Sequence, residues 1–524
     1  MKKNVLWNII YGLVVLFLGI GEAFTIAAIM KLDMLPPVYM IALIALFAIM
    51  LLLIAFLLFF KGKNPGKKRQ IIACVLAVLV VCGCAVITTV AMDVVETLEA
   101  TSQEVEEVAT REVFVMSRNP VRELAQTGAY TYGYVKGFDE DCSQQVLAEV
   151  QKQTGEEVYA IGYHNIMTMI SALLNDRIDA MIINEAYLDL LEDMEGFENF
   201  DMRAKLLAQV PVVEPEGAML TFPGMEMEED EFAQFEEFEE IPEETEAVEL
   251  DFTKLEPFVV YISGSDSRSN KLIQKGRSDV NILAVVNPMT KQVLLLNTPR
   301  DYYIGNPAAR GAKDKLTHCG VWGISNSMKA LSSLYDIKVD YYVRVNFTGF
   351  SKVIDAIGGI TVHSDVAFTV YNKTVDIKEG ENHLNGEQAL AFARTRKQLK
   401  GGDHDRGKNQ MRVIKAVIEK ATSGTTVITN YSDIIASIEG MFQMTIPAEL
   451  ISALMKMQLS DMAKWNVVTY AVTGSGAMDY CASAPSMELS VIRPSQKSVN
   501  KAKRLIEMVV SSEILTDEVV NSIS

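Results

Sequence analysis

Arginine and aspartate residues gather in four segments of the second half of the chain, at positions typical of loops instead of amphipathic surfaces. The segments read SGSDSRSN with GRSDVN, TPRDYY, LAFARTRKQ and GGDHDRGKNQ. Planar guanidinium groups bind phosphate oxygens through paired hydrogen bonds, while Mg²⁺ takes one or two carboxylates and completes its shell with water and phosphate. The cluster therefore suits a pyrophosphate held with a divalent cation, Mg²⁺ or Mn²⁺, although a set of structural ion pairs explains the composition equally well. Its members are Asp266, Asp279, Arg300, Asp301, Arg394, Arg396, Asp403, Asp405, Arg406 and Gln410.

The elements that position these residues belong to a larger α/β or α+β domain, of which we favour α/β and which we place at residues 252–524 with a core at 258–422. Its first candidate strands read FVVYISGSDS, VNILAVVN, QVLLLNTP and VDYYVRVNF. The middle two are too continuously apolar for a sheet that is wetted on one face, so helices are expected on both faces of a mixed sheet. Further elements are expected as helices at 323–335, 349–357, 385–393 and 408–421, a strand KWNVVTYAVTG and a closing helix SVNKAKRLIEMVV.

A small α/β accessory domain is expected at residues 98–225, with a helical stalk at its start. The strands EVFVMS, AYTYGYV, EVYAIGY and IDAMIIN alternate with helical stretches around 143–154 and 165–175, which predicts βαβ units and a parallel sheet. The run NIMTMISALLNDRIDAMIINEAYLDLL resembles one lobe of periplasmic solute-binding proteins, so a ligand-binding lobe and a spacer or protein-contact module both stay open. Residues 226–251 hold fourteen acidic side chains and no Lys or Arg, which is typical of a solvated linker.

Residues 1–97 are expected to be membrane-embedded, because they contain three apolar stretches long enough to cross a hydrocarbon core of about 30 Å. Basic residues lie at the N-terminus and between the second and third stretch, so the positive-inside rule places the N-terminus in the cytoplasm and both later domains outside the cell. The net charge of −19 argues against a nucleic-acid partner, because phosphate attraction needs clustered Lys and Arg. The predicted transmembrane helices run from about 5–30, 38–60 and 71–92.

The six cysteines divide by place. Three lie in the third apolar stretch, where they are expected to act as small apolar residues. Cys142, Cys319 and Cys481 face an exported, potentially oxidising compartment, and none of them forms a CxxC or a Cys/His metal spacing. We predict a Cys319–Cys481 disulfide that ties the C-terminal segment to the larger domain.

A series of motifs runs in order through residues 258–422. They read D-x-R, G-R-S-D, T-P-R-D, D-K-L-T-H, D-Y-Y-V-x-V-N-F-x-G-F, D-A-I-G-G-I, G-x-x-x-L-N-G-E-Q-A-L-A-F-A-R-T-R and G-D-x-D-R-G-x-N-Q. In this order they closely resemble the LytR-CpsA-Psr family of cell-wall glycopolymer ligases, and the three spans followed by an accessory region resemble its capsule-associated members. The resemblance implies an extracellular phosphotransferase that moves a glycopolymer, of capsule, teichoic or other type, from a polyprenyl-pyrophosphate carrier to peptidoglycan. The new phosphodiester is expected at the 6-hydroxyl of N-acetylmuramic acid.

The same resemblance assigns roles to individual residues. Asp266 and Asp279 match the positions that hold Mg²⁺ in the family. Phosphoryl transfer depends mainly on positioning and on neutralising charge, so Arg300 is a predicted catalytic residue, with Asp301 and Asp403 as candidates to accept the proton of the acceptor hydroxyl. The predicted pyrophosphate contacts are Arg277, Arg300, Arg394, Arg396 and Gln410, with Arg406 as a further candidate. Asn409 departs from the pattern, since many relatives have Arg there.

A lipid carrier requires an apolar tunnel and a membrane-lipid partner beside peptidoglycan. Tunnel candidates, each equally explained as a core residue, are Val285, Leu294, Leu296, Phe347, Phe350, Ile354 and Ile357. Lys315 is a candidate to help hold phosphate. Two other function classes remain open: a membrane-anchored regulatory or sensor protein, and a phosphatase that releases the glycan from the same carrier with water as the acceptor.

Overall fold

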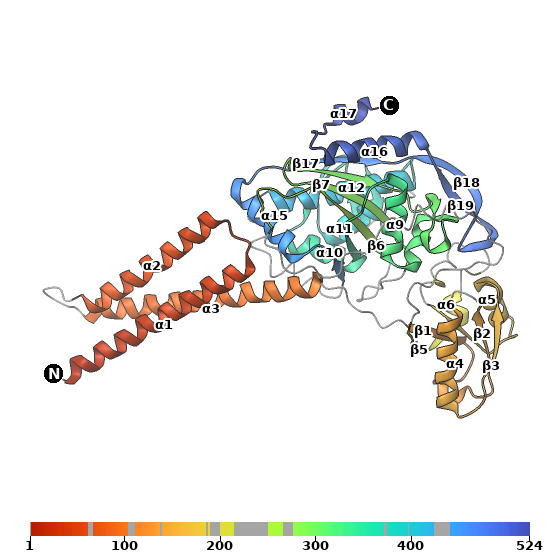
Figure 1. Cartoon of the computed structure of the whole chain (residues 1–524), viewed down its shortest axis with the longest axis horizontal. Helices are drawn as coiled ribbons and strands as arrows, with labels where there is room; N and C mark the ends of the chain where they lie inside the picture. The colour runs from red at the N-terminus through yellow and green to blue at the C-terminus, as the bar shows by residue number, and fades with distance from the viewer. Residues whose placement is uncertain are drawn as a thin grey trace.

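The computed structural model of the 524-residue chain combines three long helices with two α/β regions (Figure 1). It describes residues 2–60, 67–102, 110–136, 139–184, 187–188, 197, 200–213, 250–265, 276–370, 375–396, 398–423 and 441–523. The predicted metal ligand Asp266 and nearly all of the predicted acidic linker lie outside these residues.

Three apolar helices form the N-terminal part: α1 (Lys2–Leu32), α2 (Pro37–Phe59) and α3 (Lys67–Ser102). Each is long and apolar enough to cross a membrane, which confirms the three predicted helices. Leu18, Ile54 and Ala73 pack among them, one from each helix, while many other apolar side chains stay exposed as a lipid-facing surface requires. Helix α3 continues past the predicted span into the start of the predicted stalk.

The accessory region is a five-stranded sheet in the order β3-β2-β4-β1-β5. Strand β2 runs parallel to β3 and β4, as the βαβ pattern predicts, but β1 runs antiparallel to β4 and β5. The expectation of a wholly parallel sheet is therefore wrong. Parallel pairing is expected for strands joined by a helical crossover, but β1 pairs with β4 and β5, and no single crossover connection joins it to either one. The connection that follows β1 leads to β2 and holds only the short η1 (Leu124–Gln126). The elements are β1 (Thr110–Met116), β2 (Thr131–Val135), α4 (Glu140–Thr154), β3 (Tyr159–Tyr163), α5 (Ile166–Leu174), β4 (Ala180–Ile183), α6 (Phe200–Arg203) and β5 (Ala204–Pro211).

The larger domain is built on a six-stranded mixed sheet in the order β16-β11-β6-β7-β8-β17. Strand β6 runs parallel to β11 and antiparallel to β7, and β17 runs parallel to β8. Strand β8 is buried along its whole length, as its continuous apolar sequence predicts. The strands are β6 (Phe258–Ser265), β7 (Val280–Asn287), β8 (Gln292–Asn297), β11 (Tyr341–Asn346), β16 (Phe442–Met444) and β17 (Asn466–Ala471).

Helices cover both faces of this sheet. Tyr261 of β6 points into the cluster beneath α9 (Ile324–Tyr335) and α16 (Gln496–Val510), and its neighbour Val260 points into the cluster beneath α12 (Asp403–Thr422) and α15 (Ala448–Asp461). Alternate residues of one strand thus enter opposite core layers, as the pleat of a strand dictates. The predicted α/β class with helix–sheet–helix layers is confirmed.

Shorter elements complete the domain. A third apolar cluster holds α10 (Phe347–Ala356) and α11 (Gly386–Arg394) together. Both helices begin at an asparagine whose side chain accepts a backbone N–H: Asn346 from Gly349, and Asn385 from Gln388. The remaining elements are β9 (Tyr303–Gly305), η3 (Pro307–Ala309), β10 (Lys313–Lys315), α8 (Leu316–Cys319), η4 (Gly320–Trp322), β12 (Ile360–Ser364), β13 (Phe368–Val370), β14 (Val375–Ile377), β15 (Gly380–Leu384), β18 (Gly474–Cys481), β19 (Ala484–Pro494) and α17 (Asp517–Ser522).

The predicted Cys319–Cys481 disulfide is not formed, because both residues are free cysteines. The Cys319 thiol donates instead to the carbonyl oxygen of Lys315 at 3.8 Å, one turn earlier. The Cys481 sulfur lies with Asp314 and His318. Burial raises the pKa of both thiols, and the neighbouring Asp314 carboxylate raises it further.

Candidate functional site

A cavity of about 460 Å³ opens at the ends of β6 and β11 and at the start of β7. Ligand sites of α/β proteins commonly lie beyond the carboxyl ends of parallel strands such as β6 and β11. Helices α10, α11 and α12 supply the other walls. One set of lining residues is charged or polar and the other is apolar, so the cavity has two chemically different parts.

The polar part contains four arginines and one carboxylate: Arg300, Arg394, Arg396, Arg406 and Asp279. These residues come from four separate segments of the sequence, and the fold brings them to one cavity together with Gln410. The excess of guanidinium groups makes this part of the cavity suited to an anion that carries several phosphate oxygens.

Local structure explains how each polar residue is placed. The N–H of Asp279 donates to the Gly264 carbonyl at 2.9 Å, just before β7 begins. Arg394 is the last residue of α11, while Arg406 and Gln410 are four residues apart and so share one face of α12. Gly407 lets α12 approach the end of β8 closely, since a Cβ atom there would lie only 2.3 Å from the Asn297 amide nitrogen.

Ion pairs hold two of the arginines. Arg300 Nη1 lies 2.6 Å from Asp279 Oδ1, and the two side chains are 15% and 11% exposed. Arg406 Nη2 lies 2.7 Å from Asp403 Oδ1. Because these contacts are mostly shielded from water, they fix the guanidinium groups more firmly than surface ion pairs do.

Arg394 rests against an aromatic wall. Its guanidinium carbon lies 4.1 Å from the centre of the Phe347 ring, a distance suited to a cation–π contact. Phe347 also lines the cavity, so one ring borders both its polar and its apolar parts.

The apolar part of the cavity is lined by Phe350, Val370, Leu390 and Ile414, among others. Of the seven predicted tunnel residues, Phe347 and Phe350 line the cavity. The other five belong to the packed core, in agreement with the second interpretation, that they are core residues. Those five are Val285, Leu294, Leu296, Ile354 and Ile357.

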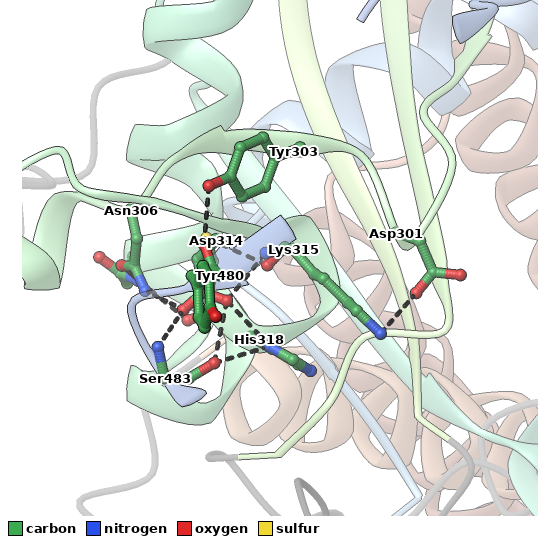
Figure 2. A network of polar contacts seen from close by, with 10 residues as sticks. Asp301, Tyr303, Asn306, Asp314, Lys315, His318, Tyr480 and Ser483 are labelled. Carbon is green, nitrogen blue, oxygen red and sulfur yellow. Dashed lines mark hydrogen bonds and ion pairs between the residues drawn. The ribbon is translucent and has the colours of Figure 1, made fainter. Parts of the chain in front are cut away.

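Several predicted site residues lie behind the cavity wall. Asp301 lies between Arg300 Nε at 3.8 Å and Lys315 Nζ at 3.5 Å, and like Asp403 it is not among the lining residues. Figure 2 shows the Lys315 side chain extending to Asp301. Lys315 is therefore a partner of the Asp301 carboxylate. Arg277, a predicted pyrophosphate contact, is buried, with 6% of its surface exposed. Proton acceptance by Asp301 or Asp403 stays a prediction.

Two buried polar residues, Asn409 and Arg344, donate hydrogen bonds to backbone carbonyls. The Asn409 amide donates to the Phe392 carbonyl at 3.4 Å, so this departure from the family pattern links α12 to α11. Arg344 in β11 is fully buried, and its guanidinium donates to the Gly276 carbonyl at 3.4 Å, next to Arg277. Sequence reasoning missed Arg344, although an arginine inside a strand of a covered sheet is itself a signal of a specific buried contact.

Two side chains at the start of α12, His404 and Asp405, have lowered pKa values. Burial and the nearby Lys408 lower the pKa of His404, although two aspartates oppose this. Burial acts to raise the pKa of Asp405, but hydrogen bonds from the Gly401 N–H and from Lys408 outweigh it, so that pKa is lowered. Asp405 is thus kept ionised at the N-terminus of the helix, where negative charge is favourable.

These features define a membrane-anchored α/β protein with a cavity for an anionic group that is joined to an apolar one. The LytR_cpsA_psr family model matches residues 227–503, more than half of the chain, and the chain belongs to that family.

Similar proteins include two that are named polyisoprenyl-teichoic acid–peptidoglycan teichoic acid transferase TagU. The Enterococcus faecalis protein is 32% identical over 197 residues, which cover 37% of this chain and 64% of that protein. The Bacillus cereus protein is 35% identical over 188 residues, which cover 36% of this chain and 60% of that protein. The chain thus spans less than two thirds of the length of these relatives.

Solved structures with a similar fold include B. subtilis TagV and TagT bound to LIIa-WTA. The TagV chain is 26% identical, with a TM-score of 0.42, and the match covers 49% of this chain and 98% of that one. The TagT chain is 25% identical, with a TM-score of 0.39, and the match covers 51% of this chain and 95% of that one.

Proposed function

We propose that the chain is an extracytoplasmic phosphotransferase that moves a glycopolymer from a polyprenyl-pyrophosphate carrier to peptidoglycan. The observation that carries the proposal is the cavity itself, in which four arginines meet an apolar wall. A pyrophosphate joined to a polyprenyl chain has the same division into a highly charged and an apolar part. The names of the relatives, polyisoprenyl-teichoic acid–peptidoglycan transferases, support this substrate class.

The proposed reaction is one phosphoryl transfer. An acceptor hydroxyl of peptidoglycan attacks the phosphorus that carries the glycan, and the bond from that phosphorus to the bridging oxygen breaks. Polyprenyl phosphate leaves with its negative charge, and the glycan remains attached through a new phosphodiester. Arg300, Arg394, Arg396 and Arg406 bind the phosphate oxygens and neutralise the charge that gathers on the leaving group.

The proton of the acceptor hydroxyl needs an oxygen base. Asp403 contacts the cavity arginine Arg406, and Asp301 lies beside Arg300. Neither carboxylate lines the cavity, so for either one to accept the proton, substrate must draw its arginine toward phosphate and bring the carboxylate within reach of the hydroxyl.

A divalent cation fits the donor set. The Asp279 carboxylate lines the cavity, and a carboxylate oxygen is a preferred ligand of Mg²⁺ and is also suited to Mn²⁺. Asp279 would hold the ion with Asp266, which lies outside the described residues. When bound, the ion would supply positive charge to neutralise the pyrophosphate.

We infer that the N-terminus is cytoplasmic and that the catalytic domain lies outside the cell. Helices α1 and α3 begin with lysines at one end of the helical bundle. At its other end, Asp33 forms a 2.6 Å ion pair with Lys456 of α15, and Met34 and Val94 pack against Met444. The larger domain thus contacts the end of the bundle opposite the basic end, which supports the orientation that the positive-inside rule favours. Contact with the helix ends keeps the apolar cavity close to the bilayer that supplies the lipid.

The test is a transfer assay read by mass spectrometry. The full chain in detergent receives a short lipid-linked pyrophosphoryl glycan, Mg²⁺ and peptidoglycan fragments. We expect glycan joined to the fragments by a phosphodiester and a loss of about 10²–10³ in rate for Arg394→Ala. Arg412→Ala is the matched control, because Arg412 lies on α12 but pairs with Asp365 and does not line the cavity. Release of free glycan phosphate alone would favour a phosphatase, and binding without turnover would favour a sensor.

A further inference from the structure

A second group of metal-ligating side chains lies outside the cavity. Asp314, His318 and Cys481 are all buried, with exposures of 0%, 0% and 1%. One ligand atom from each lies within 4.8 Å of the others. None of the three lines the phosphate cavity.

Two distant segments of the chain build this group. Asp314 lies in β10 and His318 in the helix α8 that directly follows, four residues later. Cys481 ends β18, and the turn to β19 carries Ser483. The Ala482 N–H donates to the Lys313 carbonyl at 2.9 Å, so backbone hydrogen bonding holds this turn against β10.

The polar atoms converge on one point. His318 Nδ1 lies 2.9 Å from Asp314 Oδ1, and the Ser483 hydroxyl oxygen lies 2.9 Å from Asp314 Oδ1 and 2.8 Å from His318 Nδ1 (Figure 2). In a tetrahedral site with zinc–ligand bonds of about 2.0–2.2 Å, nitrogen and oxygen ligands lie about 3.3–3.6 Å apart. Side-chain rotations that open these contacts by about 0.4–0.8 Å would therefore admit an ion.

Neighbouring groups hold the Asp314 carboxylate in place for this role. Its Oδ2 accepts from the Ser483 N–H at 3.1 Å and from the Asn306 amide at 3.3 Å, and its Oδ1 also accepts from the Lys315 N–H at 2.8 Å. All three donors are neutral. Such outer hydrogen bonds orient a metal-binding carboxylate without supplying a competing positive charge.

The chemistry of the set favours zinc. A carboxylate and a thiolate together carry two negative charges, which a divalent cation offsets, and the imidazole adds a neutral nitrogen. Zn²⁺ readily combines sulfur, nitrogen and oxygen ligands, whereas Mg²⁺ prefers oxygen ligands alone. The Lys315 ammonium of the same segment lies 3.5 Å from the Asp301 carboxylate, which offsets its positive charge.

We propose that Asp314, His318 and Cys481 bind one Zn²⁺, with the Ser483 hydroxyl or a water molecule as the fourth ligand. Binding releases the thiol proton to solvent, and the imidazole carries its remaining hydrogen on Nε2 while Nδ1 holds the metal. The ion fastens the β18–β19 turn to the β10–α8 segment. Lys315 and Asp301 connect that segment to Arg300, so the zinc site is a structural support behind the phosphate cavity.

The test measures zinc in the purified full chain. After exposure to micromolar Zn²⁺ and removal of excess, we expect about one tightly held zinc ion per chain by elemental mass spectrometry. Cys481→Ala should weaken binding at least tenfold. Cys319→Ala is the matched control, because Cys319 is an equally buried cysteine in α8 that stands outside the group; it should keep the zinc.

Cobalt provides a second readout. Co²⁺ in the wild-type protein should give the near-ultraviolet thiolate charge-transfer band together with tetrahedral visible bands, and the charge-transfer band should persist in Cys319→Ala. A folded wild-type chain that holds no zinc overturns the proposal even if Cys481→Ala fails to fold. Zinc that is retained by Cys481→Ala but lost in Asp279→Asn would place the ion in the phosphate cavity and equally overturn it.

Discussion

The contact between Phe347 and Arg394 can be tested by removing the aromatic ring while keeping an apolar side chain. Phe347→Leu loses the ring face that lies 4.1 Å from the guanidinium carbon. A cation–π contact of this kind contributes about 0.5–2 kcal/mol. If that energy holds Arg394 in its transfer position, kcat/KM should fall by about two- to thirtyfold.

Two controls make the result specific. Phe347→Tyr keeps an aromatic face and should retain most of the activity. Phe350→Leu changes another phenylalanine of the same cavity, one on which no arginine of the described residues is stacked, so its effect reports the loss of apolar surface. In the phosphodiester transfer assay, equal rates for Phe347→Leu and the wild type would refute the reasoning, and so would equal losses in Phe347→Leu and Phe350→Leu.

Three further predictions concern packing, membrane docking and pH. Gly386→Ala should lower the free energy of unfolding by about 1–3 kcal/mol in denaturant, because the added Cβ would lie 2.0 Å from a backbone oxygen. Gly476→Ala is the control, because its added Cβ meets nothing within 4 Å, and it should leave the free energy of unfolding unchanged. Each of the single exchanges Asp33→Lys and Lys456→Asp should lower the melting temperature of the full chain in detergent, because it places like charges together. The double exchange should restore the melting temperature, with a coupling energy of about 0.5–1 kcal/mol between the two residues. Equal melting temperatures for all forms would contradict the ion pair. The pKa of His404 in the folded chain lies below its ordinary value of 6.5, so as pH drops the unfolded chain takes up the proton first. The stability of the fold therefore falls as pH drops from 6.5 through the folded pKa. His404→Gln should flatten this part of the profile of melting temperature against pH, and an unchanged slope would argue against the shift.

Local sequence pattern predicted the elements that carry the site. The helix expected at 408–421 is α12, which begins earlier at Asp403, and the polar residues of its first turns were already within the GGDHDRGKNQ segment. The apolar strand VNILAVVN became the covered strand β7 because its composition leaves no wetted face. Convergence of Arg300, Arg394 and Arg406 on one cavity followed from their places at the ends of such elements.

What the sequence could not predict depends on contacts between distant segments. The antiparallel pairing of β1 with β5 joins segments more than 80 residues apart and has no local signature. Local pattern also gives no sign that Asp301 would be held between Arg300 and Lys315 behind the cavity wall. The group of Asp314, His318 and Cys481 has no metal-binding spacing, since more than 160 residues separate its cysteine from its histidine.

The most direct measurement is a structure of the full chain with a polyprenyl-pyrophosphoryl glycan and Mg²⁺, determined by electron cryomicroscopy or crystallography. The account predicts that the pyrophosphate oxygens contact Arg300, Arg394, Arg396 and Arg406, that the cation lies against Asp279, and that the lipid contacts Phe347 and Phe350. A pyrophosphate bound elsewhere, or a lipid outside this cavity, would contradict it.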